Sequence, residues 1–278
     1  MSRHHVDLKR ELEELKKKAE GVFKSERRVF DARASAAVRL MDAIGGEEVQ
    51  FGEGAFHRVL VDASAVWSEA EAFHREYLEA LGSPFFPAAA GFGTLKALRE
   101  VRPERICYLD IETTGLSMAP LFLVGLMYTS EGRLAVDQLF ARDYSEEAAV
   151  LAYLASLMPR FDVLVTFNGI AFDVPYIEER MTIHRLAFRE PATHVDLLPL
   201  ARSVVGDRTP NHRLQTLEAH FCGRRRVGDI AGADIPASYH EFVRTQDAKD
   251  MATIIHHNRL DLVTMLQLVT VFLSGRAE

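Results

Sequence analysis

The alternation of apolar and polar residues predicts five β-strands in the middle of the chain. One apolar run begins at Arg105 and ends in a Thr-Thr-Gly turn. The runs 121–129 and 133–141 follow it, separated from each other by a Ser-Glu-Gly-Arg turn. Together these three runs predict an antiparallel meander. The apolar runs 163–168 and 193–198 predict two further strands.

Apolar residues at helical spacing predict helices between and after these strands. Residues 145–158 and 173–184 have this spacing, and so does the segment HHNRLDLVTMLQL near the C-terminus. Strands that alternate with helices are typical of an α/β fold in which helices cover both faces of the sheet. We therefore expect a mixed five-stranded sheet with helices on both faces, in a domain that spans residues 96–278.

The first 95 residues have a different pattern and suggest no particular chemistry. They predict helices and a small β-hairpin, placed over residues 6–20 (helix), 33–44 (helix), 47–66 (hairpin) and 68–81 (helix). A segment rich in Pro, Ala and Gly, residues 84–93, suggests a linker. Residues 1–95 are thus expected to form an N-terminal extension. Its charged first helix is expected to be solvated, and binding of a protein partner is the alternative.

Composition and charge exclude several classes of protein. The chain has 278 residues, of which 48% are hydrophobic and 26% charged, as is typical of a globular protein. No apolar run approaches the ~18 residues that a membrane span needs, and the charged N-terminus lacks the apolar core of a signal peptide. We therefore expect a cytoplasmic protein that does not bind membranes. The net charge of −7 argues against a protein that coats nucleic acid, but it is compatible with a nuclease whose acidic site binds metal ions.

Candidate chemistry first appears at the end of the strand that begins at Arg105. Asp110 and Glu112 are two positions apart, so in an extended strand both side chains lie on the same face of the sheet. Carboxylates buried in this way cost several kcal/mol unless a cation or a proton compensates them. A hard divalent cation is the simplest compensation. The alternative is a strand end at which the two acids reach solvent.

Two further acids complete a recognisable set. Asp173 lies at a second transition from strand to helix, and Asp261 lies on the C-terminal helix. In order and setting, the four acids resemble those of the DEDD exonucleases, the DnaQ-like branch of the ribonuclease H-like superfamily. Within this branch the chain is similar to the YprB-like family. The motifs that carry the similarity are D-I-E-T-T-G-L at 110–116, F-N-G-x-x-F-D at 167–173 followed by Arg180, V-D-L-L at 195–198 and H-N-x-x-D at 257–261.

The resemblance implies a ribonuclease H-like fold whose four acids converge at one end of the sheet. In the DEDD pattern the position of Asp110 bridges two metal ions, and the positions of Glu112, Asp173 and Asp261 complete the ligands. A ligand set of oxygen atoms alone favours Mg²⁺ or Mn²⁺ over zinc. The expected activity is hydrolysis of phosphodiester bonds by a 3′ to 5′ exonuclease with two divalent metal ions. Its expected substrate is a single-stranded 3′ end of DNA or RNA.

A general base is expected just before the last acid. The family uses a His or Tyr five or four residues upstream, and this chain has histidines at both places, His256 and His257. On a continuous helix, residues four apart share a face, which favours His257. His256 remains the alternative, because the histidine at the longer spacing can precede the regular helix.

Other residues are expected to contact the substrate. In relatives, the residues after the D-x-E contact the terminal nucleotide, which indicates Thr113, Gly115 and Leu116 here. Asn168 is a further expected polar contact. Asp196 follows a strand, where it could approach the metals from outside their ligand shell or cap a helix.

The segment from Arg202 to Arg226 is rich in arginine. It holds six arginines against two acids, and Arg224, Arg225 and Arg226 are consecutive. At the rim of an acidic site, guanidinium groups would neutralise an incoming phosphate backbone. The alternative for this segment is a solvated loop.

Two rival functions remain at this point. The first is a non-catalytic ribonuclease H-like module that binds nucleic acid or a protein. The second is a nuclease of another branch, such as a transposase or junction resolvase. The presence of all four acids favours an exonuclease over the first, and the N-G-x-x-F-D and H-N-x-x-D segments favour it over the second.

Overall fold

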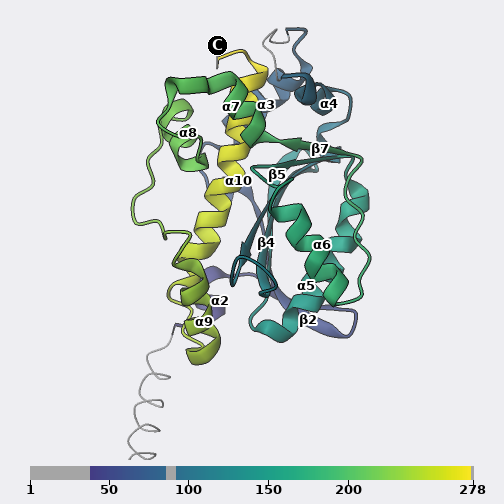
Figure 1. Ribbon diagram of the computed structural model, residues 1–278, viewed down its shortest axis with the longest axis vertical. Coiled ribbons are helices and arrows are strands. Elements are labelled where there is room, and N and C mark those ends of the chain that lie inside the picture. The colour runs from purple at the N-terminus through teal and green to yellow at the C-terminus, as the bar shows by residue number, and fades with distance from the viewer. Residues whose placement is uncertain (1–37, 86–91, 277–278) are drawn as a thin grey trace, which may run out of the picture.

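The computed structural model describes residues 38–85 and 92–276, and they form a seven-stranded mixed sheet with helices on both faces (Figure 1). The strands are β1 Glu47–Phe51, β2 Gly54–Asp62, β3 Ile106–Thr113, β4 Leu121–Ser130, β5 Arg133–Phe140, β6 Val163–Thr166 and β7 Thr193–Asp196. The helices are α2 Leu40–Ile44, α3 Ala70–Gly82, α4 Lys96–Arg99, α5 Glu147–Leu157, α6 Asp173–Ile183, α7 Leu197–Val205, α8 Leu214–Phe221, α9 Ile235–Thr245 and α10 Met251–Leu273. The expected α/β fold is confirmed. The helix expected at 6–20 lies outside the described residues.

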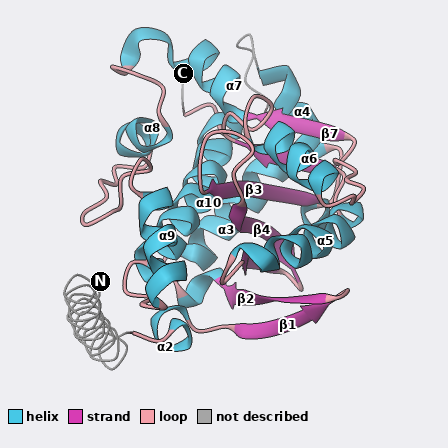
Figure 2. Cartoon of the chain, turned by 60° about the horizontal axis from the view of Figure 1, so that its bottom comes forward, coloured by secondary structure: helices cyan, strands magenta, loops and turns pink. Residues whose placement is uncertain are grey.

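The order of the strands is β1-β2-β5-β4-β3-β6-β7. The meander β3-β4-β5 is antiparallel, whereas β6 runs parallel to β3 and β7 runs parallel to β6. The N-terminal hairpin β1-β2 pairs antiparallel with β5 and lies at one edge of the sheet (Figure 2). The sheet therefore has seven strands, two more than the five expected, because the hairpin covers backbone groups that β5 would otherwise leave unpaired. The division of the chain near residue 95 stays a prediction.

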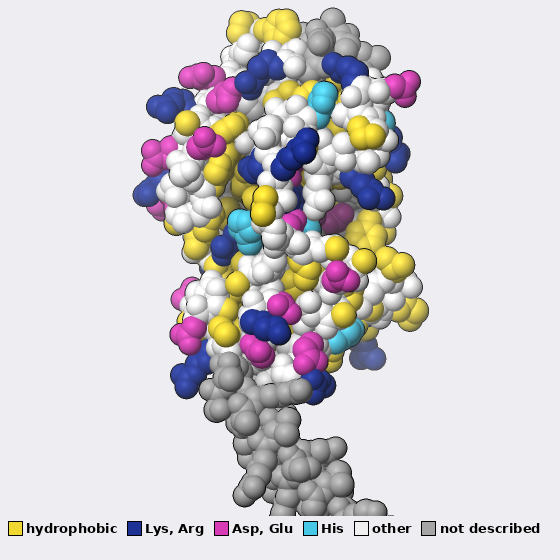
Figure 3. All heavy atoms as spheres, turned by 90° about the vertical axis from the view of Figure 1, so that its left-hand side faces the viewer, with side chains coloured by type: hydrophobic (Ala, Val, Ile, Leu, Met, Phe, Trp, Pro, Cys, Tyr) yellow, Lys and Arg dark blue, Asp and Glu magenta, His cyan; other side chains and the backbone are white. Residues whose placement is uncertain are grey.

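Two hydrophobic layers sandwich the sheet. Helices α5 and α6 pack on one face, together with Cys107, Leu109 and Ile111 of β3. Helices α3 and α10 pack on the other face, together with Ile106 and Tyr108. Because side chains alternate along a strand, the acids of β3 lie on the face that α10 covers. Helices α8 and α9 contact α10 on its outer side, which Figure 3 shows face on.

A glycine in the sheet allows α10 to lie close to it. Gly125 of β4 is the register partner of Asp110, and a Cβ atom at this position would overlap the side-chain amide of Asn258 on α10. The contact between helix and strand therefore depends on the absence of a side chain at Gly125.

No helix in the described ranges is long and apolar enough to span a bilayer.

We predict that Gly125→Ala destabilises the protein by about 1–3 kcal/mol, because the new methyl group must displace Asn258 or α10 in a well-packed interior. Gly82→Ala is the control, since a Cβ atom at Gly82 meets nothing within 4 Å. Urea denaturation followed by circular dichroism measures both variants. Equal stability of the two variants would show that α10 can move away from β4 at little cost.

Candidate active site

Asp110 is fixed by a chain of amide hydrogen bonds from α10 and β5. Asn258 Nδ2 donates to Asp110 Oδ2 at 2.8 Å, and Gln138 Nε2 donates to Asn258 Oδ1 at 2.8 Å. Gln138 Nε2 also donates to the carbonyl of Ile255 at 2.9 Å. Asn258 and Gln138 are fully buried, so neither amide can exchange its partners for water. The side chain of Asp110 is therefore held in one orientation.

Asp173 is the first residue of α6, and a loop anchored by Asp196 brings it into place. Asp196 Oδ1 accepts from the backbone N–H of Asn168 at 2.8 Å, and its Oδ2 accepts from that of Ile170 at 3.2 Å. The same carboxylate caps α7 by accepting from the backbone N–H of Leu198 at 3.0 Å. The helix cap expected as one of two roles of Asp196 is thus present, and its approach to the metals stays a prediction. Asn168 has a φ of 69°, which forms the turn before α6.

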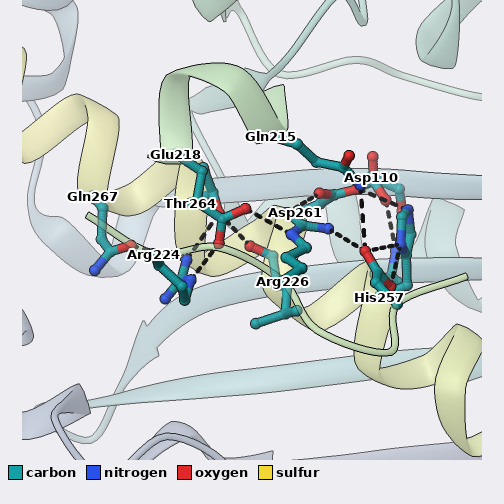
Figure 4. A network of polar contacts seen from close by, with 12 residues as sticks. Asp110, Gln215, Glu218, Arg224, Arg226, His257, Asp261, Thr264 and Gln267 are labelled. Carbon is teal, nitrogen blue, oxygen red and sulfur yellow. Dashed lines mark hydrogen bonds and ion pairs between the residues drawn. The ribbon is translucent and has the colours of Figure 1, made fainter. Parts of the chain in front are cut away.

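Asp261 lies on α10, one turn after His257, and both of its oxygens have partners (Figure 4). Arg226 Nη2 donates to Asp261 Oδ1 at 2.6 Å. His257 Nε2 lies 3.4 Å from Asp261 Oδ2. A side-chain cation and an imidazole thus flank the fourth acid.

The four acids share one electrostatic environment. Burial raises the pKa of Asp110 well above its usual range, and the charges of Asp261, Glu112 and Asp173 raise it further. Burial likewise raises the pKa of Glu112 well above normal, with additional repulsion from Asp261 and Asp173. Burial raises the pKa of Asp173 to about 7, and it raises the pKa of Asp261 even though Arg226 and His257 lower it. The carboxylates of two strand residues and two helix residues therefore lie close enough to repel one another.

This donor set suits a hard divalent cation in its chemistry, because it offers oxygen atoms alone and their charges repel. Within residues 38–85 and 92–276, however, no three acidic, histidine or cysteine side chains are already arranged to hold a metal ion. Binding of a cation therefore requires rotations of side chains, and Asp261 would have to turn from the contacts with Arg226 and His257. Asp110, Glu112, Asp173 and Asp261 are the residues that would hold it.

The geometry separates the two candidate histidines. His257 is buried, and its Nδ1 lies 2.8 Å and 2.9 Å from the two carboxylate oxygens of Asp229. A carboxylate only accepts, so Nδ1 carries a proton and donates to Asp229, and Nε2 faces Asp261. His256 is exposed and lines a different pocket, away from the acids.

Asp229 and Asn258 contact site residues, but the sequence alone did not single them out. Asn258 stands inside the H-N-x-x-D motif, so a signal for it was present. Asp229 comes from the segment between α8 and α9, and nothing in its spacing links it to His257. Its position beside α10 is a consequence of the tertiary fold.

The run of three arginines has divided roles. Arg226 is nearly buried and forms ion pairs with Glu218 and Asp261, and Arg224 also pairs with Glu218 (Figure 4). Arg225 is exposed. Two of the three guanidinium groups that were expected to meet phosphate are thus engaged inside the protein.

A pocket of about 570 Å³ opens at Asp110 and Asp261. Asn168 lines it, and so do two exposed arginines, Arg202 of α7 and Arg213 before α8. Neither arginine has an acidic partner among the described residues. The pocket therefore combines acids for a cation with cationic groups for an anion.

The turn after β3 is braced from α6. Thr113 Oγ1 donates to the carbonyl of Gly115 at 2.7 Å, which also accepts from Tyr176 Oη at 3.1 Å. Arg180 donates to the carbonyl of Met118 at 3.0 Å. Leu116 is 90% exposed at the tip of this turn, where it can contact a bound molecule.

The fold and these residues together define the class of protein. A family model described as the RNase H superfamily matches residues 107–273, which include the four acids and His257. The chain therefore belongs to the RNase H superfamily, and the expected ribonuclease H-like fold is confirmed. Membership of this superfamily supports nuclease-type activity in general.

Within this superfamily the chain is similar to the uncharacterized protein YprB of Bacillus subtilis (strain 168), with 32% identity over 167 residues. This confirms that it belongs to a YprB-like, ribonuclease H-like family. The match covers 58% of this chain and 40% of YprB, so the chain spans less than half of that relative. The solved structure of the family B DNA polymerase from the hyperthermophilic archaeon Pyrobaculum calidifontis is 19% identical, with a TM-score of 0.49. The structural match covers 63% of this chain and 25% of the polymerase chain.

The raised pKa values predict how stability depends on pH. The folded state binds protons on Asp110, Glu112, Asp173 and Asp261 more tightly than the unfolded state does. Their favourable contribution is complete below the unfolded pKa of about 4 and is lost as the pH rises through the folded values. With a chelator present, Asp110→Asn should therefore raise Tm more at about pH 8 than at about pH 5. The expected rise is roughly 2–4 °C for each kcal/mol that the substitution adds to the free energy of unfolding.

Differential scanning fluorimetry measures this difference, and comparison with the wild type removes the effect of groups elsewhere. Added Mn²⁺ should raise Tm of the wild type at about pH 8, and raise that of the variant less. An Asp110→Asn variant whose stability falls equally at both pH values would contradict the charge repulsion described above.

Proposed function

We propose that this protein is a metal-dependent 3′ to 5′ exonuclease that hydrolyses phosphodiester bonds of single-stranded DNA or RNA. The observation that carries the proposal is the meeting of four carboxylates, one buried and three partly buried, each with a raised pKa, beside an imidazole whose Nε2 faces the last of them. Membership of the RNase H superfamily supports the reaction class. The direction of cleavage and the two-metal mechanism are inferred from the DEDD order of the acids.

The acids would hold the cations, and two divalent ions, Mg²⁺ or Mn²⁺, would polarise the scissile phosphate and lower the pKa of the attacking water. Asn258 and Gln138 keep Asp110 oriented toward this position. Asp261 would turn from Arg226 and His257 to join the other acids, and Arg226 would keep its ion pair with Glu218.

His257 is the general base in this proposal. Because Nδ1 is hydrogen-bonded to Asp229, Nε2 is the ring nitrogen on the side of Asp261 and the one that would act as the base. Nε2 would take the proton of the attacking water, and Asp229 would stabilise the imidazolium that forms. A proton transfer of this kind contributes about 10²–10⁴-fold to a rate.

The pocket beside the acids suits the 3′ end of a single-stranded nucleic acid. Arg202 and Arg213 line it and can bind a phosphate, and Asn168 offers an amide to a base or sugar. Leu116, exposed on the braced turn, can pack against the terminal base.

One contact supports a second candidate function. Arg226 already neutralises Asp261 through the pair at 2.6 Å, so a side chain does part of what a divalent cation would do. A ribonuclease H-like module stabilised in this way would bind nucleic acid without hydrolysing it.

Degradation of 5′-labelled single-stranded DNA and RNA tests the proposal and separates the two candidates. With Mn²⁺ we expect a ladder that shortens from the 3′ end with the wild type, and no ladder with Asp110→Asn or with chelator. The sugar that supports the ladder identifies the substrate class. Binding of both oligonucleotides without cleavage under any condition would contradict the nuclease and favour the binding module.

A pair of histidine variants tests the base. His257→Ala should lower kcat by about 10²–10⁴-fold, whereas His256→Ala should leave it within about twofold, because His256 is exposed away from the acids. Single-turnover cleavage at saturating Mn²⁺ measures both variants. A larger loss in His256→Ala than in His257→Ala would reverse the assignment.

A further inference from the structure

A second pocket lies on the side of α10 that faces away from Asp261. It has a volume of about 360 Å³. Its walls are the residues that follow β2, the segment 224–229 and four residues of α10, namely His256, Arg259, Leu260 and Val263. At about 100° per residue, these four positions lie on the opposite side of the helix from Asp261. The pocket is therefore separate from the acidic site.

One wall of this pocket is aromatic and apolar. Trp67, the single tryptophan of the chain, lines it, and the tryptophan ring packs on Phe73 with centroids 4.8 Å apart. Leu260 and Val263 line the pocket from α10, and Val227 lies at its edge with 96% of its surface exposed. An indole ring and aliphatic groups of this kind offer a surface for a flat apolar ring.

Another part of the wall is cationic. Arg225 is exposed, and Arg259 donates from Nε to Gln138 Oε1 at 2.6 Å. Neither guanidinium has an acidic partner within the part of the chain that the structure describes. The acids of the wall are Glu69 and Asp229, and Asp229 is engaged by His257. The pocket therefore attracts an anionic group beside its aromatic surface.

We propose that this pocket binds one nucleotide unit of a single-stranded nucleic acid, with the base against Trp67 and the phosphate between Arg225 and Arg259. Every base has a flat π-face that stacks on an aromatic ring, and guanidinium groups bind phosphate with charge-assisted hydrogen bonds. An uncharged aromatic ligand would leave the two arginines without a counter-charge. The combination of ring and cations thus favours a nucleotide.

The pocket adjoins the acidic site through the segment 224–229. Arg226 and Asp229 line the pocket, and the same two residues contact Asp261 and His257. Figure 3 shows the face formed by α8, α9 and the segment between them, where basic, acidic and hydrophobic side chains are interspersed. A nucleic-acid strand bound at Trp67 would therefore contact the segment that also binds Asp261 and His257. This inference rests on the proposed function, and it adds a strand-binding site in which the N-terminal part of the chain takes part.

The single tryptophan allows a direct measurement. Fluorescence of Trp67 is followed while the full chain, with chelator present, is titrated with an oligothymidylate of about eight nucleotides. We expect saturable quenching, because a stacked base quenches the indole. Arg225→Gln should weaken the binding by about fivefold or more, while Arg133→Gln, an exposed arginine outside this pocket, should leave it unchanged.

A second variant tests the stacking on Trp67, and a second ligand distinguishes a nucleic-acid strand from a free nucleotide. Trp67→Ala should weaken binding of a fluorescently labelled oligothymidylate by about fivefold or more in an anisotropy titration, since stacking contributes this much per base. Thymidine monophosphate should bind at least about tenfold more weakly than the oligonucleotide. Equal or tighter binding of the mononucleotide would assign the pocket to a free nucleotide and overturn the strand site.

The measurements distinguish a failure of the proposed pocket from a failure of the proposed nuclease. Because chelator prevents metal-dependent cleavage, the titration reports binding alone. Suppose that the protein cleaves oligonucleotides with Mn²⁺, but that Trp67 fluorescence does not change on titration, or that Arg225→Gln is quenched as strongly as the wild type. This result would overturn the pocket assignment and leave the proposed nuclease intact. Quenching that is lost in Arg225→Gln, in a protein that never cleaves, would support the pocket and contradict the nuclease.

Discussion

The contact between α10 and strand β3 is the constraint on which the site depends. Asn258 of α10 donates to the carboxylate of Asp110, and it can do so because Gly125 has no side chain in the way. Through this contact the C-terminal helix is set at a fixed rotation, which turns Asp261 and His257 toward the sheet and His256 away from it. The position of one buried amide thus fixes which residues of α10 meet the strand acids.

The burial that brings the acids together also creates an electrostatic cost. Each of the four acids has a raised pKa, which means that the folded protein destabilises their charged forms. Arg226 offsets part of this cost at Asp261, and Glu218 and Asp229 surround the same guanidinium. A divalent cation from solution would offset the remaining repulsion between the carboxylates. The two candidate functions differ in whether the site binds such a cation.

The N-terminal part of the chain is joined to this arrangement in two ways. The hairpin β1-β2 extends the sheet from β5, and Trp67, shortly after it, reaches the pocket behind α10. Residues on both sides of the expected boundary near 95 therefore build one sheet and one pocket wall. Arg226 and Asp229 line that pocket and also contact Asp261 and His257, so the segment 224–229 links the pocket to the acidic site although the two pockets have no lining residue in common.

The sequence by itself determined the strands and most of the helices, because period, length and turn residues are local properties of a chain. The four acids were predicted from the resemblance of their motifs to the DEDD exonucleases, and their role as metal ligands stays a prediction. The sequence could place Asp110 and Glu112 on one face, since this follows from alternation alone. Only the tertiary structure decided that Asp229 lies beside His257, that Arg226 is engaged with Asp261 and that the hairpin joins β5. These contacts join residues far apart in sequence or on different elements, and which partners meet depends on how the helices and strands pack, for which no local pattern exists.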